Sequence, residues 1–320
     1  MKTPCFLQID HDDPSVIRAD VINALRAEAA SIAPKHFYDA LGARLFSAIT
    51  ELPEYYPTRT EAAIFAQHGG AMARVVAESV GTSTWVDLGA GNCEKAARLF
   101  GLFGVKRYVA VDISVDYLAH SLDHLQRLHP TMDLMGIGMD FSRQMALPAG
   151  CGDGPRLIFY PGSSIGNFDP AEALQFLRQV HQAAQGGALL IGVDLVKPLD
   201  ILESAYDDPL GVTAAFNRNL LLHVNRLIGS DFQLADWRHV ASFNRLASRI
   251  EMHLEASRES TVRWMGGERR FVKGQRIHTE NSYKWRVEDF AELLAQAGFT
   301  GARQWTDERN WFAVFLAIAR

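Results

Sequence analysis

Residues 84–95 read as a strand that runs into a glycine turn and then into a helix, and no other stretch constrains the fold as strongly. The sequence here is Thr-Trp-Val-Asp-Leu-Gly-Ala-Gly-Asn-Cys-Glu-Lys. The apolar residues before the turn suit a buried central strand. Gly89 and Gly91 allow a sharp turn and leave room for a ligand against the backbone. The pattern predicts a βα unit with a ligand at the N-terminus of the following helix, which we expect over residues 94–103.

The identity of this ligand depends on the residues around the turn. A second predicted strand, residues 107–112, ends in Asp112 about 20 residues after the glycines, a spacing typical of an acidic residue that binds a ribose. The third glycine of the dinucleotide pattern G-x-G-x-x-G is absent. Its absence, with Asp87 just before the turn, favours a nucleoside without phosphates, of which S-adenosylmethionine is the commonest. A turn that uses glycine only for its geometry is the alternative at this point.

The composition is that of a globular protein without a nucleic-acid or membrane partner. The chain has 320 residues, of which 48% are hydrophobic and 22% charged, and this length suits two domains. A net charge of −5 provides no basic field for phosphate backbones. No apolar run approaches the ~20 residues of a membrane span, and the N-terminus does not read as a signal peptide. We expect a cytoplasmic monomer that acts on a small molecule.

Cysteines and histidines show no metal-binding pattern. Cys5, Cys93 and Cys151 are odd in number and widely separated, which fits reduced thiols better than disulfides. The 11 histidines include no pair at metal-ligand spacing with an acidic neighbour. We therefore expect chemistry without a metal.

Two adjacent tyrosines, Tyr55 and Tyr56, lie between prolines ahead of the glycine turn. Each proline removes a backbone donor and restricts the residue before it. We therefore expect a rigid loop that presents these residues and Tyr38 to a substrate. Tyrosines that pack with one satisfied hydroxyl are the alternative. Helices are expected before and after this segment, over residues 14–30 and 61–79.

Polar residues follow two further predicted strands. The strand over residues 133–141 ends in Asp140 and Phe141, which could hydrogen-bond an adenine amine and stack on its ring. The strand over residues 156–160 leads into a loop that holds Asn167. This loop faces the glycine turn, because ligands collect beyond the carboxyl ends of parallel strands. An amide at this place suits an amino acid, since it accepts from an amine and donates to a carboxylate.

The pattern changes after a fifth strand at residues 188–194. Long helices and short strands follow, which we interpret as an inserted α+β domain. Two strands near the C-terminus, residues 301–305 and 311–318, are close enough in sequence to require an antiparallel pair. This layout is α/β: a class I, Rossmann-like methyltransferase sheet, mostly parallel with an antiparallel closing strand. The predicted domains are an S-adenosylmethionine-binding domain over residues 61–196 and 286–320, and a substrate-binding domain over residues 10–60 and 197–285.

Six short motifs allow comparison with known families. They are Pro-Lys-His-Phe-Tyr (34–38), Leu-Pro-Glu-Tyr-Tyr-Pro-Thr-Arg (52–59), Asp-Leu-Gly-Ala-Gly (87–91), Pro-Gly-Ser-Ser-Ile-Gly-Asn (161–167), Tyr-Asp-Asp-Pro (206–209) and Phe-Asn-Arg-Asn (216–219). Together they resemble the histidine Nα-methyltransferase family of ergothioneine biosynthesis. The resemblance implies trimethylation of the α-amine of L-histidine by S-adenosylmethionine, which gives hercynine. A family member that acts on a tryptophan derivative is one alternative, and a non-catalytic adenosine-binding protein is another.

The resemblance also implies roles for residues that match the family's motifs. It assigns cofactor contacts to Gly89, Lys95, Asp112, Asp140 and Phe141, to which the glycine turn adds Gly91. It assigns the substrate carboxylate to Tyr38 and Tyr206, and the amine, with the catalytic role, to Tyr55 and Asn167. Glu280 and Ser282 match the pair that binds the imidazole. A carboxylate and a hydroxyl suit this ring, because neutral imidazole has one N–H donor and one acceptor nitrogen.

Overall fold

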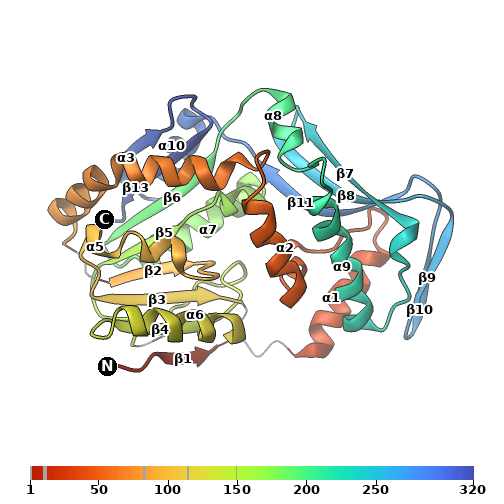
Figure 1. Ribbon diagram of the computed structural model, residues 1–320, viewed down its shortest axis with the longest axis horizontal. Coiled ribbons are helices and arrows are strands. Elements are labelled where there is room, and N and C mark those ends of the chain that lie inside the picture. The colour runs from red at the N-terminus through yellow and green to blue at the C-terminus, as the bar shows by residue number, and fades with distance from the viewer. Residues whose placement is uncertain (1, 10–12, 82–83, 114, 149) are drawn as a thin grey trace. The chain divides into compact units, whose positions relative to one another are not determined.

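The computed structural model describes residues 2–9, 13–81, 84–113, 115–148 and 150–320 (Figure 1). The chain divides into two compact units. Unit 1 comprises Met1–His11, Arg59–Leu195 and Trp285–Arg320, and unit 2 comprises Asp12–Thr58 and Val196–Lys284. Each unit is therefore assembled from segments that are far apart in the sequence.

Unit 1 is built on a central sheet. Its strands are β1 (Cys5–Gln8), β2 (Thr84–Leu88), β3 (Arg107–Asp112), β4 (Asp133–Gly138), β5 (Arg156–Tyr160), β6 (Ala188–Asp194), β12 (Thr300–Thr306) and β13 (Phe312–Ile318). Within the described residues the order across the sheet is β1-β4-β3-β2-β5-β6-β13-β12. Neighbours from β1 to β6 pair in parallel, whereas β13 pairs antiparallel with both β6 and β12. The predicted mostly parallel sheet with an antiparallel closing strand is confirmed.

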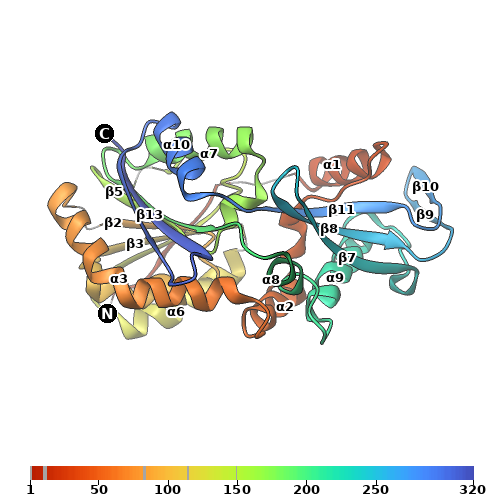
Figure 2. The same ribbon diagram turned by 90° about the horizontal axis from the view of Figure 1, so that it is seen from above.

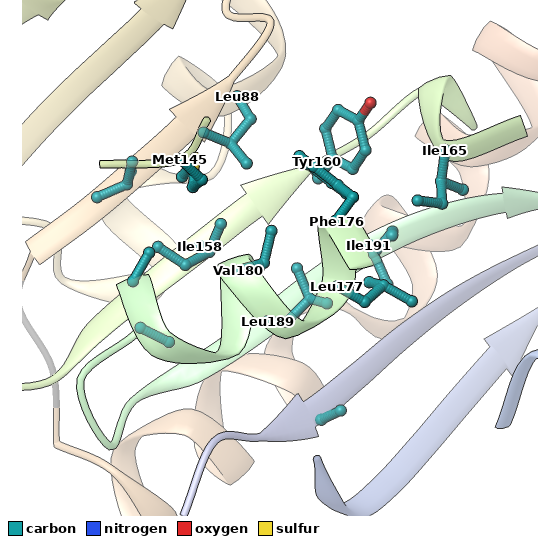
Figure 3. Close-up of a cluster of buried hydrophobic side chains, with 14 of the residues drawn as sticks. Leu88, Met145, Ile158, Tyr160, Ile165, Phe176, Leu177, Val180, Leu189 and Ile191 are labelled. Carbon is teal, nitrogen blue, oxygen red and sulfur yellow. The ribbon is translucent and has the colours of Figure 1, made fainter. Parts of the chain in front are cut away.

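Helices cover both faces of this sheet (Figure 2). One face packs against α3 (Tyr56–Ser79), α4 (Glu94–Ala97), α5 (Phe100–Phe103) and α6 (Val115–Leu128), and the other against α7 (Pro170–Ala183) and α10 (Val287–Gln296). Side chains alternate between the two faces of β2. Val86 and Leu88 therefore pack in the core under α7, and Trp85 packs in the core under α3. Figure 3 shows the core around α7. A strand buried on both faces is expected to be mostly apolar, which is the pattern of the central strands.

Two predicted helices differ from those observed. Helix α3 begins at Tyr56, not at residue 61, and includes Pro57. The expectation that Tyr56 lies on a loop is therefore wrong, because a proline in the first helical turn interrupts no intrahelical hydrogen bond. The helix predicted over residues 94–103 is two short helices, α4 and α5. The Leu99 N–H donates to the carbonyl of Ala96, a tighter turn that separates them.

Three further segments differ from prediction, two of them at one edge of the unit 1 sheet. Strand β1 was not predicted; its four residues are exposed and pair with β4 at the sheet's edge. The strand predicted over residues 133–141 ends at Gly138, so Asp140 and Phe141 lie just beyond it. The helix predicted over residues 14–30 ends at Arg26.

Unit 2 combines helices with antiparallel strands. Its strands are β7 (Trp237–Asn244), β8 (Arg249–Ala256) and β11 (Arg276–Tyr283), in the order β11-β8-β7, and the hairpin β9 (Ser260–Trp264) and β10 (Gly267–Phe271). Its helices are α1 (Pro14–Arg26), η1 (Pro34–Phe37), α2 (Ala40–Thr50), α8 (Leu199–Ser204), α9 (Val212–Ile228) and η3 (Leu234–Asp236). Helix α9 packs on β7, β8, α2 and η1 through a buried apolar face. Its Phe216 stacks on Phe37 with ring centroids 4.5 Å apart.

Candidate active site

The glycine turn follows β2 at the carboxyl edge of the unit 1 sheet. Gly89 and Gly91 have φ of 72° and 52°, a left-handed conformation that favours glycine. A Cβ atom at Gly89 would lie 3.8 Å from Cζ of Phe141, so that ring lies beside the turn. A Cβ atom at Gly91 would meet nothing within 4 Å. The turn therefore leaves open space over Gly91.

Asp112, the last residue of β3, holds this turn in place. Its Oδ2 accepts a hydrogen bond of 2.9 Å from the N–H of Gly91. The N–H groups of Gly89 and Ala90 donate to the carbonyl of Val111, at 2.8 and 3.1 Å. The parallel register of β2 and β3 brings about this contact, because it aligns Leu88 with Val111. The structure thus brings together the glycines and the carboxylate that the sequence spacing paired.

Asp87 lies in β2, two residues before Gly89, and is buried. Its Oδ2 accepts a 2.7 Å hydrogen bond from the Tyr108 hydroxyl, whereas its buried Oδ1 has no hydrogen-bond partner among the described residues. Burial raises the pKa of Asp87 to about 7. A buried acceptor without a donor costs about 1–3 kcal/mol. Together with the open space over Gly91, this acceptor fits a ligand that brings donors to the turn.

Lys95 lies in a network that the sequence did not predict. It donates to Oε2 of the buried Glu61 at 2.8 Å, and Oε1 of Glu61 accepts from the N–H of Gly162 at 2.7 Å. A Cβ atom at Gly192 would lie 2.0 Å from that Oε1, so β6 has a glycine where the carboxylate fits. Glu61 therefore ties α4 to the loop that leads to Asn167. In the sequence, the signal that could have pointed to Glu61 is its position in the Thr-Arg-Thr-Glu segment (58–61) shortly after the two tyrosines.

The loop after β5 carries Asn167 at the end of η2 (Ser164–Asn167). Ser163, just before η2, is buried and left-handed, with φ of 60°. Its hydroxyl accepts a 2.8 Å hydrogen bond from the N–H of Asp194 at the end of β6. This bond anchors the loop to the carboxyl edge of the sheet, where Asn167 was predicted.

Asp140 and Phe141 follow β4 at the same edge. Asp140 is buried and accepts from the N–H of Ser142 at 3.2 Å, and Nε of Arg143 lies 3.7 Å from its Oδ2. The Phe141 ring meets the Tyr160 ring edge-on, with centroids 6.0 Å apart. All the predicted cofactor residues thus lie near the carboxyl ends of parallel strands of unit 1.

Three predicted substrate tyrosines of unit 2 lie in one aromatic cluster. Tyr38 contacts Phe46 with centroids 5.7 Å apart, Phe46 contacts Tyr55 at 6.2 Å, and Tyr55 contacts Tyr206 at 6.3 Å. Phe46, on α2, was not predicted as part of the site. Tyr56 behaves differently: it is buried and its hydroxyl accepts from Lys197 at 2.7 Å. Tyr56 is therefore a packing residue with a satisfied hydroxyl.

Glu280 and Ser282 point to the same face of β11, because side chains alternate along a strand. Both are buried, at 9% and 4% exposure. Their register partners on β8 are the apolar Met252 and Ile250. The Ser282 hydroxyl lies 2.7 Å from that of Tyr206, so the structure brings these two predicted residues together. Burial raises the pKa of Glu280 to about 7 even though the positive charge of Lys284 opposes the shift.

Replacing Glu280 with glutamine should stabilise the ligand-free protein at about pH 8 far more than at about pH 5. The pKa of Glu280 rises from an ordinary 4.5 to about 7 on folding. Between these values the folded state keeps a proton that the unfolded state has lost, so stability falls as the pH rises through this window. Above about pH 7, the ionised Glu280 therefore lowers the free energy of unfolding of the parent by about 3 kcal/mol. Urea unfolding at both pH values measures it.

Glu255 on β8 supplies a control of opposite sign. Hydrogen bonds from Arg276 and Arg238 hold its pKa below its ordinary range, so its ionised form contributes stability that is lost as the pH falls. Glu255→Gln should therefore destabilise the protein at about pH 8. An equal gain for Glu280→Gln at both pH values would contradict the burial argument.

The strand order of unit 1, its glycine turn and the carboxylate at the end of β3 define a class I S-adenosylmethionine-dependent methyltransferase. Comparison with known proteins specifies the class further. The chain belongs to the family of histidine-specific, S-adenosylmethionine-dependent methyltransferases, whose profile matches residues 17–319. The predicted family, enzyme class and cofactor are thus confirmed.

Individual relatives align with almost the whole chain. It is 39% identical over 310 residues to histidine N-alpha-methyltransferase of Mycolicibacterium smegmatis and 38% identical over 309 residues to that of Mycobacterium tuberculosis. Each alignment covers 94% of this chain and 94% of the relative. It is also 24% identical over 323 residues to 4-dimethylallyltryptophan N-methyltransferase of Claviceps purpurea, which covers 92% of each. The relatives of this chain therefore include enzymes whose names specify different amino-acid substrates.

Two further properties concern the part of the chain that the structure describes. None of its helices has both the length and the apolarity that crossing a bilayer requires. It also contains no group of three or more His, Cys, Asp or Glu side chains arranged to hold a metal ion.

Proposed function

We propose that this protein transfers three methyl groups from S-adenosylmethionine to the α-amine of L-histidine, which gives hercynine. The observation that carries the proposal is the buried pair Glu280 and Ser282 on one face of β11, beside Tyr206. A carboxylate accepts from the N–H of an imidazole, and a hydroxyl donates to its other nitrogen. The two histidine N-alpha-methyltransferases at 38–39% identity support the same substrate.

The other binding roles are part of this proposal. Cofactor binding is assigned to Gly89, Gly91, Lys95, Asp112, Asp140 and Phe141. The turn fits S-adenosylmethionine, because its ribose hydroxyls and ammonium are donors for Asp112 and for acceptors such as Asp87. The substrate carboxylate is assigned to Tyr38 and Tyr206, and its amine to Tyr55 and Asn167.

The main contribution of the chain to the reaction is to position the substrate amine toward the methyl group. When bound, S-adenosylmethionine supplies an electrophilic methyl group on a sulfonium. The α-amine attacks only after it has lost its proton, so Tyr55 and Asn167 are proposed to bind the neutral amine and to direct its lone pair. Orientation of this kind is worth up to ~7–11 kcal/mol. The aromatic cluster of Tyr38, Phe46, Tyr55 and Tyr206 would stabilise the quaternary product by ~0.5–2 kcal/mol through cation–π contacts.

One assay tests the function directly. The purified protein is incubated with S-adenosylmethionine and each amino acid in turn, and mass spectrometry counts the methyl groups added. We expect histidine to gain up to three. Methylation of tryptophan or its prenylated derivatives in preference to histidine would replace this proposal with the other substrate class of the family. If no amino acid is methylated, a non-catalytic adenosine-binding protein becomes the better hypothesis.

We further propose that the protein works in the cytoplasm as a monomer and without nucleic acid. The net charge of −5 supports the last point, because it offers no field that would attract a phosphate backbone. Light scattering of the purified protein measures the oligomeric state.

A further inference from the structure

Lys284 is a buried lysine next to two proposed substrate residues. It is the residue after the end of β11 and is 3% exposed. Its Nζ donates to the Ser282 hydroxyl at 2.8 Å and to the Tyr206 hydroxyl at 3.0 Å, and lies 4.7 Å from the centroid of the Tyr206 ring. The two hydroxyls lie 2.7 Å apart. We call Lys284, Ser282 and Tyr206 the hydroxyl triangle.

The number of protons in the hydroxyl triangle restricts what it offers a ligand. An ammonium has three donors and no acceptor, so both hydroxyl oxygens accept from Lys284. Tyr206 and Ser282 have one hydroxyl proton each, and one of these two protons lies in the bond between them. Only the other hydroxyl proton can be donated outside the triangle. The two hydroxyls together therefore act as one O–H donor, which is what the unprotonated nitrogen of an imidazole requires.

Lys284 also provides the positive charge that acts on Glu280. Glu280, Ser282 and Lys284 alternate along the chain, which is the spacing of one strand face. On β8 the register partners of Glu280 and Ser282 are Met252 and Ile250, which carry no charge. Tyr206, in the turn after α8, brings a phenol hydroxyl to Ser282, the neighbour of Glu280 on this face. The attraction of Lys284 opposes the desolvation of the Glu280 carboxylate.

We propose that Lys284 is a positioning residue for recognition of the imidazole ring. Its ammonium orients the hydroxyls of Tyr206 and Ser282 into a single donor for one ring nitrogen, and its charge keeps Glu280 available to accept from the other. This inference rests on the proposed function, because it assumes that histidine is the substrate. It adds Lys284 and Tyr206 to Glu280 and Ser282 as residues that recognise the ring, and because the one outward hydroxyl proton is used by the ring nitrogen, it leaves the substrate carboxylate to Tyr38.

The test compares Lys284→Met with the parent enzyme over a range of pH. We expect KM for histidine to rise roughly tenfold or more, with kcat within about threefold, because binding and not chemistry is affected. Without the ammonium, Glu280 takes up its proton more readily. The acid limb of kcat/KM should therefore move to higher pH by about one unit or more. The substrate amine contributes a limb of its own, which is the same in every variant.

Lys197→Met is the matched control. Lys197 is also buried in unit 2 and donates to a tyrosine hydroxyl, that of Tyr56, at 2.7 Å. The same charge is removed, so a general loss of stability appears in both variants. The acid limb should stay in place for Lys197→Met.

Lys284→Arg covers the case in which Lys284→Met does not fold. Arginine keeps the charge and changes the hydrogen-bond geometry, so KM should rise while the acid limb stays in place. A limb that moves in Lys284→Arg, or a folded Lys284→Met with the parent's KM and acid limb, overturns the inference. A parent enzyme that does not methylate histidine refutes the proposed function instead, so the two failures are distinguishable.

Discussion

Replacement of Asp112 with alanine should weaken the binding of S-adenosylmethionine roughly 100-fold. The carboxylate is expected to accept from ribose hydroxyls, and a hydrogen bond to a charged group is worth about 1.5–3 kcal/mol. The structure adds a second loss, because Oδ2 of Asp112 also accepts from the N–H of Gly91. Alanine leaves that N–H without this acceptor and loosens the turn that forms the site. Titration calorimetry with S-adenosylmethionine and its demethylated product measures the effect.

Asp133 provides the control for this experiment. It begins β4, the neighbour of β3, and is paired in register with Arg107 at the opposite end from Asp112. It forms exposed contacts with Lys2 and Arg107, which contribute about 1 kcal/mol or less. Asp133→Ala should leave cofactor affinity unchanged. Unchanged affinity in a folded Asp112→Ala variant would remove Asp112 from the cofactor site.

Simultaneous replacement of Glu280 and Ser282 with alanine should reduce kcat/KM for histidine at least roughly tenfold and up to roughly 100-fold. The variant loses the acceptor for one ring nitrogen and a hydroxyl for the other. A lost charge-assisted bond costs about 1.5–3 kcal/mol, and each 1.4 kcal/mol is a factor of ten. Activity toward tryptophan or phenylalanine should fall less, because the pocket face becomes more apolar. Steady-state kinetics with each amino acid measure the change.

Asn281 is the matched control for the double variant. It lies between the two residues in β11, faces the opposite side of the strand and accepts from His278 at 2.8 Å. Asn281→Ala should keep histidine turnover close to that of the parent. If the double variant methylates histidine as well as the parent does, the imidazole assignment is wrong, and a tryptophan-type substrate becomes the better hypothesis.

The predicted stability gain in Glu280→Gln has a functional meaning. A carboxylate with a pKa of about 7 in the folded state destabilises the ligand-free protein when it is ionised. Proteins retain such groups where a ligand needs them, and the proposed ligand here brings an N–H donor. Stability and histidine recognition should therefore change in opposite directions at this one residue.

The central strands of the unit 1 sheet could be predicted from the sequence because they are mostly apolar and end at turns. Strands β5 and β6 have the predicted bounds, residues 156–160 and 188–194. The contact of Asp112 with the glycine turn was also predictable. In consecutive βα units the carboxyl ends of parallel strands lie at one edge of the sheet, so spacing along the chain becomes proximity in space.

The partners of buried polar side chains were decided only by the tertiary structure. Lys284 and Tyr206 are 78 residues apart, and Glu61 and Gly162 are 101 residues apart. Local periodicity reports which face of an element is apolar, but it does not report which charged residue will be buried or what will neutralise it. The start of α3 at Tyr56 was missed for a related reason. Proline is compatible with both a loop and a first helical turn, and packing of the tyrosine, whose hydroxyl accepts from Lys197, distinguishes them.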